Sequence, residues 1–368
     1  MAESPIEEAE KEDFEDGRDQ LVKLSLLQRV ESGTYQLHQL VREYFLAKLA
    51  QREDAETLQQ AYGEVMVAKG SQIPQALTRE RWVALTPVMP HIAEAATQWQ
   101  GQLSDEDLYR PFIAMARFYD GQGAYAQAKP WYKKGLTATQ SRFGENHPDV
   151  ATSLNNLALL YRSQGRYEEA EPLFLQALEM SRELLGQSHP SVATSLNNLA
   201  TLYKSQGRYE EAEPLFLQAL ELSRELLGQS HPSVATSLNN LAALYRSQGR
   251  YEEAELMYLQ ALDLRRELLG QSHPSVATSL NNLGLLYRSQ GRYEDAEPIY
   301  LKTISIFRDR LGDEHPYTRT ANNNFYLLVK AALTAGKQAK LSSQPLTQKM
   351  LESVKAEQNN TEQNSTGQ

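Results

Sequence analysis

Apolar residues recur along most of the chain at helical spacing, and the whole arrangement repeats every 42 residues. The repeat is marked by the dipeptide His-Pro, which occurs at His147, His189, His231, His273 and His315. In the first full period, an amphipathic helix is indicated by Val150, Leu154, Leu157, Ala158 and Tyr161. After a break at Gly165, a second stripe consists of Ala170, Phe174, Ala177 and Leu178 and stops before Gly186. Each period therefore predicts two helices, and because neither can bury its stripe alone, successive units must stack.

The pattern divides the chain into a repeat array and its flanks. Full units cover 147–188, 189–230, 231–272 and 273–314, and a degenerate unit at 103–146 keeps the same register. A last helix over 315–336 carries Asn322 where the first full unit has Leu154, so its stripe becomes polar, as an end cap requires. The segment 337–368 is rich in Gln, Asn, Ser, Thr and Lys, which predicts a disordered tail.

The order of small and large residues in each unit resembles the tetratricopeptide repeat. In the first full unit this order is Leu157, Ala158, Tyr161, Gly165, Ala170, Phe174 and Ala177. The 42-residue length, the LNNLA.LY...G.Y.EAE pattern and the terminal LG..HP resemble the repeats of kinesin light chains and their prokaryotic relatives. The resemblance covers 103–336. It implies an all-α fold, a right-handed superhelix (an α-solenoid) in which the first helix of each unit lines a concave, peptide-binding groove.

Comparison of the units indicates one face of the first helix. The units at 147 and 189 differ at four positions, and one of these varies most across the full units, as Leu159, Thr201, Ala243 and Leu285. Residues at i, i+4 and i+7 share a helix face, so Asn155, residue 159 and Arg162 form one stripe. By the resemblance, this stripe faces the groove, and residue 159 and its equivalents set the side-chain preference for a peptide.

Two polar rows follow from this stripe. The amide row is Asn155, Asn197, Asn239 and Asn281, and the cationic row is Arg162, Lys204, Arg246 and Arg288; Asn323 and Lys330 continue them in the last helix. Amides offer a donor and an acceptor to the backbone of an extended peptide, and cations suit an acidic one. Two alternatives stay open: the asparagines can bond across helices and hold the stack, and the arginines can be solvated surface charge.

The evenly spaced histidines also suggest a metal site, but geometry disfavours it. Neighbouring units stack about 10 Å apart, whereas zinc–nitrogen bonds are about 2 Å long, so a role at the helix start is favoured. No nucleophile–base pair, metal cluster or phosphate-binding loop occurs at a meaningful spacing. We therefore predict no enzyme activity and no cofactor.

The first 102 residues follow a different pattern. Within 1–52 the pattern predicts two short strands on either side of Glu31–Thr34, followed by a helix that carries Leu40 to Leu49. A helical connector is predicted over 53–102. The phrase YQLHQLVREYFLAKL resembles the winged-helix segment of STAND (NB-ARC) signalling ATPases, in some of which a histidine matching His38 contacts nucleotide phosphate. Because this chain has no GxxxxGK[ST] loop, we interpret His38 as structural.

Composition narrows the class of partner. The formal net charge of −10 argues against a nucleic-acid binder. The sequence has no cysteine, no secretory-type start and no apolar stretch long enough for a membrane span, so we expect a cytoplasmic protein that does not bind membranes. The predicted function is a non-enzymatic scaffold that binds an extended, acidic peptide segment of a partner protein. The alternative is the sensor or regulatory half of a truncated or split STAND-type ATPase, with a separate ATPase subunit as its partner.

Overall fold

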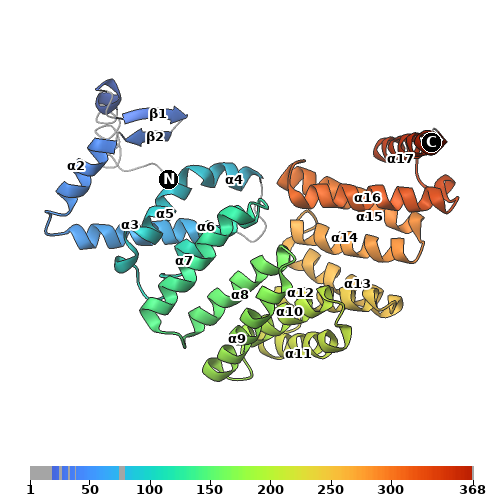
Figure 1. Ribbon diagram of the computed structural model, residues 1–368, viewed down its shortest axis with the longest axis horizontal. Coiled ribbons are helices and arrows are strands. Elements are labelled where there is room, and N and C mark those ends of the chain that lie inside the picture. The colour runs from blue at the N-terminus through green and yellow to red at the C-terminus, as the bar shows by residue number, and fades with distance from the viewer. Residues whose placement is uncertain (1–18, 25–26, 32–33, 38, 74–78, 367–368) are drawn as a thin grey trace.

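The computed structural model describes residues 19–24, 27–31, 34–37, 39–73 and 79–366. Helices pack in consecutive pairs that follow one another around a curved solenoid (Figure 1). The array comprises α6 (Arg110–Asp120), α7 (Tyr125–Phe143), α8 (Pro148–Ser163), α9 (Tyr167–Leu185), α10 (Pro190–Ser205), α11 (Tyr209–Leu227), α12 (Pro232–Ser247), α13 (Tyr251–Leu269), α14 (Pro274–Ser289), α15 (Tyr293–Leu311) and α16 (Pro316–Thr334). The predicted α-solenoid is confirmed.

Shorter elements flank the array. Before it lie α3 (Ala55–Ser71), α4 (Arg79–Leu85), η1 (Thr86–Val88), α5 (Met89–Thr97) and η2 (Gln100–Gln102); after it come η3 (Gln338–Lys340) and α17 (Pro345–Thr366). None of the described helices combines the length and the apolar composition that a bilayer span requires.

The predicted hairpin is present at the N-terminal side. Strands β1 (Leu27–Glu31) and β2 (Thr34–Leu37) pair antiparallel, with Leu27 opposite Leu37, and α2 (Gln39–Leu49) follows. The resemblance to a winged helix stays a prediction, and His38 lies outside the described residues.

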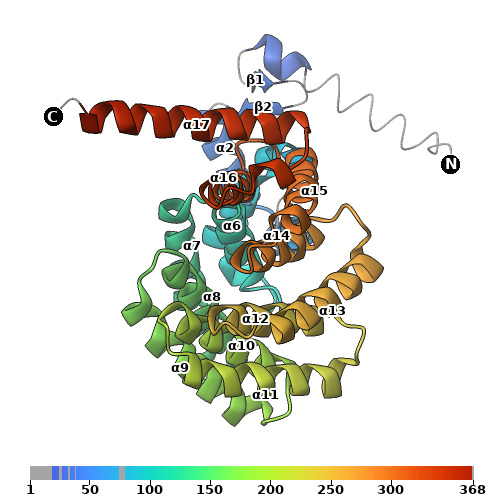
Figure 2. The same ribbon diagram turned by 90° about the vertical axis from the view of Figure 1, so that its right-hand side faces the viewer.

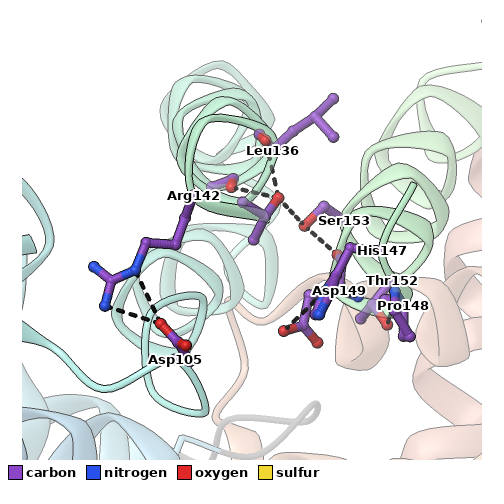
Figure 3. A network of polar contacts seen from close by, with 10 residues as sticks. Asp105, Leu136, Arg142, His147, Pro148, Asp149, Thr152 and Ser153 are labelled. Carbon is purple, nitrogen blue, oxygen red and sulfur yellow. Dashed lines mark hydrogen bonds and ion pairs between the residues drawn. The ribbon is translucent and has the colours of Figure 1, made fainter. Parts of the chain in front are cut away.

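The histidines begin the first helix of each unit. The Nδ1 atom of His147 accepts a hydrogen bond from the backbone N–H of Asp149 at 3.2 Å (Figure 3). The same contact recurs at His189, His231, His273 and His315. Each imidazole thus satisfies one of the N–H groups that a helix start leaves without a partner. The helix-start role is confirmed, and no cluster of potential metal ligands occurs in the described part of the chain.

Glycine allows the chain to reverse after each helix. Gly165 follows α8 at φ +72°, and Gly186 follows α9 at φ 83° and ψ 165°. The second conformation is almost confined to glycine, because a Cβ atom would clash with the backbone there. The two helices of a unit can therefore fold back on each other. Most of their buried apolar residues belong to one cluster that runs from Ala116 to Val354, and Val150, Leu154 and Ala177 of the first full unit belong to a smaller one.

The two ends of the array meet. The turn that joins α6 to α7 lies against the start of α16, and a Cβ atom added to Gly123 would be 3.3 Å from Cγ of Pro316. Helix α4 also contacts α15, and a pocket of about 560 Å³ lies at the junction, lined in part by Trp82, Gln122 and His315. Figures 1 and 2 show the chain curving around until these ends approach. The array therefore closes into a ring around its concave side.

The predicted disordered tail is wrong for the described residues. Helix α17 packs on α16 and crosses the end of the array (Figure 2). Its residues Leu351 and Val354, together with Leu341, are buried in the main core. Helix α16 is therefore not an exposed cap, because this segment covers it. Composition misled here, since a few apolar residues at helical spacing suffice to bury one face among many polar residues.

A buried carboxylate holds this C-terminal segment. Glu297 on α15 is 3% exposed, and it accepts hydrogen bonds from the backbone N–H of Ser342 at 2.8 Å, from Oγ of Ser342 and from Oγ1 of Thr347 at 2.6 Å. The equivalent glutamates of the preceding units pair instead with an arginine of the next unit; they are Glu171, Glu213 and Glu255. Thr334 stands where that arginine would be in the last repeat, so the same carboxylate binds the C-terminal segment.

Candidate functional site

The first helices of the units lie on the concave side. Helices α8, α10, α12, α14 and α16 contact one another in succession, whereas the second helices are further apart. On α8, Leu154, Leu157 and Ala158 are buried, while Asn155 and Arg162 stay partly exposed. The stripe predicted from helical spacing is therefore a partly exposed face of a helix on the concave side.

The amide row forms a ladder within the array. Asn155 donates from Nδ2 to Oγ of Ser195 at 2.7 Å, and its Oδ1 accepts from Nδ2 of Asn198 at 3.3 Å. Further along, Asn197 donates to Ser237, and the Oδ1 atoms of Asn197, Asn239 and Asn281 accept from Asn240, Asn282 and Asn324. Asn197 and Asn239 are only 8% and 6% exposed. The ladder favours the stacking alternative, and contact of this row with peptide backbone stays a prediction.

Asn197→Ala is expected to lower the free energy of unfolding by about 1–2 kcal/mol, because it removes the hydrogen-bond partner of the buried Ser237 hydroxyl and of the partly buried Asn240 amide. Urea denaturation would measure it. The matched control is Asn323→Ala in the same row, where the side chain is exposed and little change is expected. Equal effects of the two substitutions would contradict the structural role of the ladder.

Each unit carries a second arginine four residues after the predicted one, and this arginine is fully paired. Arg250 bonds Glu213 of the previous unit and Glu253 of its own unit, both at 2.7 Å, and its guanidinium lies 3.7 Å from the Tyr245 ring centre. The same arrangement recurs at Arg208 and Arg292. These arginines hold neighbouring units together, and sequence spacing alone did not distinguish them from the predicted row.

The predicted cationic row contrasts with these paired arginines. In the described part of the chain, no carboxylate forms an ion pair with Arg162, Lys204, Arg246 or Arg288. Nε of Arg246 and Nη1 of Arg288 are buried without a hydrogen-bond partner. Cations that are partly buried without counter-charge are unfavourable unless something else compensates them. The row is therefore a candidate site for an anionic ligand.

Electrostatics connects the members of the row. Burial, together with the positive charges of Arg246 and Arg162, lowers the pKa of Lys204 to about 8. Burial also lowers the pKa of Arg162. Helices α8, α10 and α12 thus bring their cations close enough to repel one another.

Both ends of the row are defined. The predicted continuation, Lys330, pairs with Glu357 of α17 at 3.1 Å, so its charge is already compensated. At the other end, Arg162 lies near Tyr317 on α16, close to where the ends of the array meet. The uncompensated charge is therefore confined to the full units.

The variable position, residue 159 and its equivalents, differs in exposure from one unit to the next. Leu159, Thr201 and Leu285 are partly exposed, whereas Ala243 is 8% exposed. The hydroxyl of Thr201 bonds the backbone carbonyl of Asn197 at 2.7 Å. A role of this position in peptide preference stays a prediction.

Sequence reasoning missed two tyrosines behind the row. Tyr258 and Tyr300 occupy the position that is Phe174 and Phe216 in the first two full units. The hydroxyl of Tyr258 interacts with Arg246, and that of Tyr300 is buried near Arg288 and Arg246 without a hydrogen-bond partner. The change from Phe to Tyr between near-identical units was the signal in the sequence.

Models of known protein families match the repeat array. One model of the tetratricopeptide repeat matches residues 108–183 and 191–267, and a second matches 276–317, together more than half of the chain. The chain belongs to the tetratricopeptide repeat family. A search of curated proteins finds no match.

Several solved structures resemble this tetratricopeptide repeat protein. BtubC from P. vanneervenii is 26% identical with a TM-score of 0.46, over 69% of this chain and 92% of that chain. A Podosopora anserina protein with nearly identical TPR-like repeats is 28% identical with a TM-score of 0.45, over 58% and 98%. The quorum sensor NprR from B. thuringiensis is 17% identical with a TM-score of 0.53, over 85% and 84%, which shows a shared fold alone.

Proposed function

We propose that this tetratricopeptide repeat protein is a non-enzymatic scaffold whose concave groove binds an extended, acidic segment of a partner protein. The proposal rests on the uncompensated cationic row of Arg162, Lys204, Arg246 and Arg288. A carboxylate-bearing peptide would supply the missing counter-charge in a partly desolvated groove, where ion pairs are stronger than on an open surface.

The closed ring favours an extended ligand over a folded domain. The ends of the array meet at Gly123 and Pro316, so a ligand on the inner row must be slender. NprR, which shares the fold at 17% identity, has been solved with its cognate peptide NprX. That is a precedent for the fold only.

The spacing of the units suggests a register for the ligand. Packed helices lie about 8–10 Å apart, and an extended chain advances roughly 3.3 Å per residue. One unit therefore corresponds to about three peptide residues. We expect the preferred ligand to carry an acidic side chain at about every third position.

The test uses a fluorescein-labelled peptide, acetyl-(Asp-Thr-Ser)4-amide, measured by fluorescence anisotropy at low salt. We expect it to bind at least tenfold more tightly than the peptide with Asn for Asp, and more tightly than one with the four Asp residues adjacent. Neutralisation of the row by Arg162→Gln, Lys204→Gln, Arg246→Gln and Arg288→Gln together should abolish the difference.

The matched control removes the same charge from exposed positions: Lys133→Gln, Lys302→Gln, Arg310→Gln and Lys349→Gln. This variant should bind like wild type. Equal loss in both variants would mean that net charge, not the groove, governs binding, and the proposal would fail. Equal binding of the two Asp peptides would remove the register but keep the acidic groove.

A further inference from the structure

The two halves of the cationic row differ in what lies behind them. Phe174, Phe216, Tyr258 and Tyr300 occupy equivalent positions on α9, α11, α13 and α15, and all four rings are at most 1% exposed. Only the last two carry a hydroxyl. The array is thus nearly uniform in its core but chemically asymmetric next to Arg246 and Arg288.

A buried hydroxyl in an apolar core is unfavourable unless it has a partner. Phenylalanine would fill the same space without this cost, as it does in the first two full units. The Tyr258 hydroxyl interacts with the Arg246 guanidinium. The Tyr300 hydroxyl lies within electrostatic range of Arg288 and Arg246, and it is buried without a partner. Packing therefore does not explain these hydroxyls.

The helix beside Tyr300 is adapted to it. Gly284 on α14 replaces the alanine of the other units, Ala158, Ala200 and Ala242. A Cβ atom at Gly284 would lie 3.0 to 3.2 Å from three carbons of the Tyr300 ring. Glycine in a helix interior is unfavourable by itself, so the substitution gives Tyr300 room that alanine would restrict.

A neutral hydroxyl next to a guanidinium has a specific effect. It can accept an N–H hydrogen bond and orient the planar group without cancelling the positive charge. The paired arginines of the array, such as Arg250, are instead held by carboxylates that do cancel it. Arg246 and Arg288 thus keep their full charge, and the fork geometry of each suits the two oxygens of a carboxylate.

We propose that Arg246 and Arg288, which lie beside the buried hydroxyls of Tyr258 and Tyr300, form a discrete anchor for one carboxylate of the acidic peptide. The inference rests on the proposed function and adds that the four cations of the row contribute unequally to peptide binding. Arg162 and Lys204, which have Phe174 and Phe216 behind them, contribute attraction at longer range. Tyr258 is a positioning residue, because its hydroxyl acts through Arg246. Tyr300 places a neutral hydroxyl without a partner near Arg288.

Charge-conserving substitutions test whether Arg246 and Arg288 contribute more to peptide binding than Arg162 does. They use the peptide and the anisotropy assay described above. Arg246→Lys with Arg288→Lys keeps the charge but removes the fork, and it should weaken binding about tenfold. Arg162→Lys is the matched control, because Lys204 shows that the row accepts lysine; it should change binding less than about twofold. Equal effects of the two variants would overturn the anchor.

The hydroxyls are tested by Tyr258→Phe with Tyr300→Phe. This variant should fold, because phenylalanine already fills the equivalent positions, and unchanged or higher thermal stability would verify it. We expect binding of the peptide to weaken about three- to fivefold, with the salt dependence unchanged because no charge is lost. Binding equal to wild type would remove the tyrosines from the proposal and overturn it.

A second probe separates failure of the anchor from failure of the peptide function. Succinate and inorganic phosphate are compared with chloride at matched ionic strength, and the thermal midpoint is recorded. Stabilisation by succinate that disappears in Arg246→Lys with Arg288→Lys supports the anchor even if no peptide binds. Absence of any succinate effect together with absence of peptide binding overturns both. Stabilisation by phosphate alone contradicts the carboxylate assignment.

Discussion

Glu297→Ala is expected to release the C-terminal segment from the array. The carboxylate is 3% exposed and accepts three hydrogen bonds from Ser342 and Thr347. Its removal leaves a backbone N–H and two hydroxyls without partners, and each hydrogen bond to a charged group contributes about 1.5–3 kcal/mol. Because the segment can partly relax into water, we expect a loss of about 2–4 kcal/mol in the free energy of docking.

Hydrogen exchange of the backbone amides is the measurement. Exchange should accelerate over 341–357 and in α16, whose Tyr326 and Lys330 bond Glu357 of α17. The rest of the array should keep its protection, since each repeat unit depends mainly on its neighbours. The matched control is Glu294→Gln on the same helix, whose partner Lys340 is exposed, and its cost should stay below about 1 kcal/mol. Unchanged exchange over 341–357 in Glu297→Ala would contradict the prediction.

Lys204→Met is expected to stabilise the fold and weaken the binding of acidic peptides. The folded protein holds the pKa of Lys204 at about 8, below its ordinary value, because of burial and the charges of Arg162 and Arg246. The charged form is therefore less favourable in the folded chain than in the unfolded one. Removing this charge while keeping an apolar stem of similar length should raise the free energy of unfolding by about 1–3 kcal/mol at neutral pH.

The stability of the wild-type protein should depend on pH through the titration of Lys204, and the direction of the change can be derived. Below about pH 8 Lys204 is charged in both states, so the full penalty is present. Between about pH 8 and the ordinary lysine value near 10.4, the unfolded chain binds more protons than the folded one, so wild-type stability should rise with pH. Above that range the penalty is absent.

The matched control for this prediction is Lys204→Arg, the residue found at the other positions of the row. It keeps the charge and does not titrate in this range, so the stability gain of wild type relative to this variant should appear only above about pH 8. Urea midpoints at pH 7 and pH 10 measure both effects. A lower midpoint for Lys204→Met than for wild type at pH 7 would contradict the prediction.

If Lys204→Met raises stability but weakens peptide binding, that pair of effects would indicate that Lys204 serves a ligand and not the fold. A residue that serves the fold lowers stability when it is removed, as expected for Asn197. A residue kept for a ligand can raise stability when it is removed, because the ligand supplies the compensation. The amide and cationic rows lie on one helix face, yet we expect opposite changes in stability when a residue of each row is removed.

The sequence by itself determined the features that depend on neighbours along the chain. The 42-residue period, the paired helices, the His-Pro helix starts and the glycine turns all follow from interactions within a few residues. Local sterics and helix periodicity suffice for them. Helical spacing also placed Asn155 and Arg162 on one helix face, and the resemblance to tetratricopeptide repeats predicted that this face lines the groove.

Only the tertiary structure decided which polar groups are already satisfied. Arg162 and Arg166 lie one turn apart in sequence, but the paired row receives carboxylates within its unit and from the preceding unit, and the other row does not. The same holds for the asparagine ladder, for Glu297 with Ser342, and for the meeting of Gly123 with Pro316. These contacts depend on the curvature with which units stack, a property of the whole array that the spacing inside one helix does not contain.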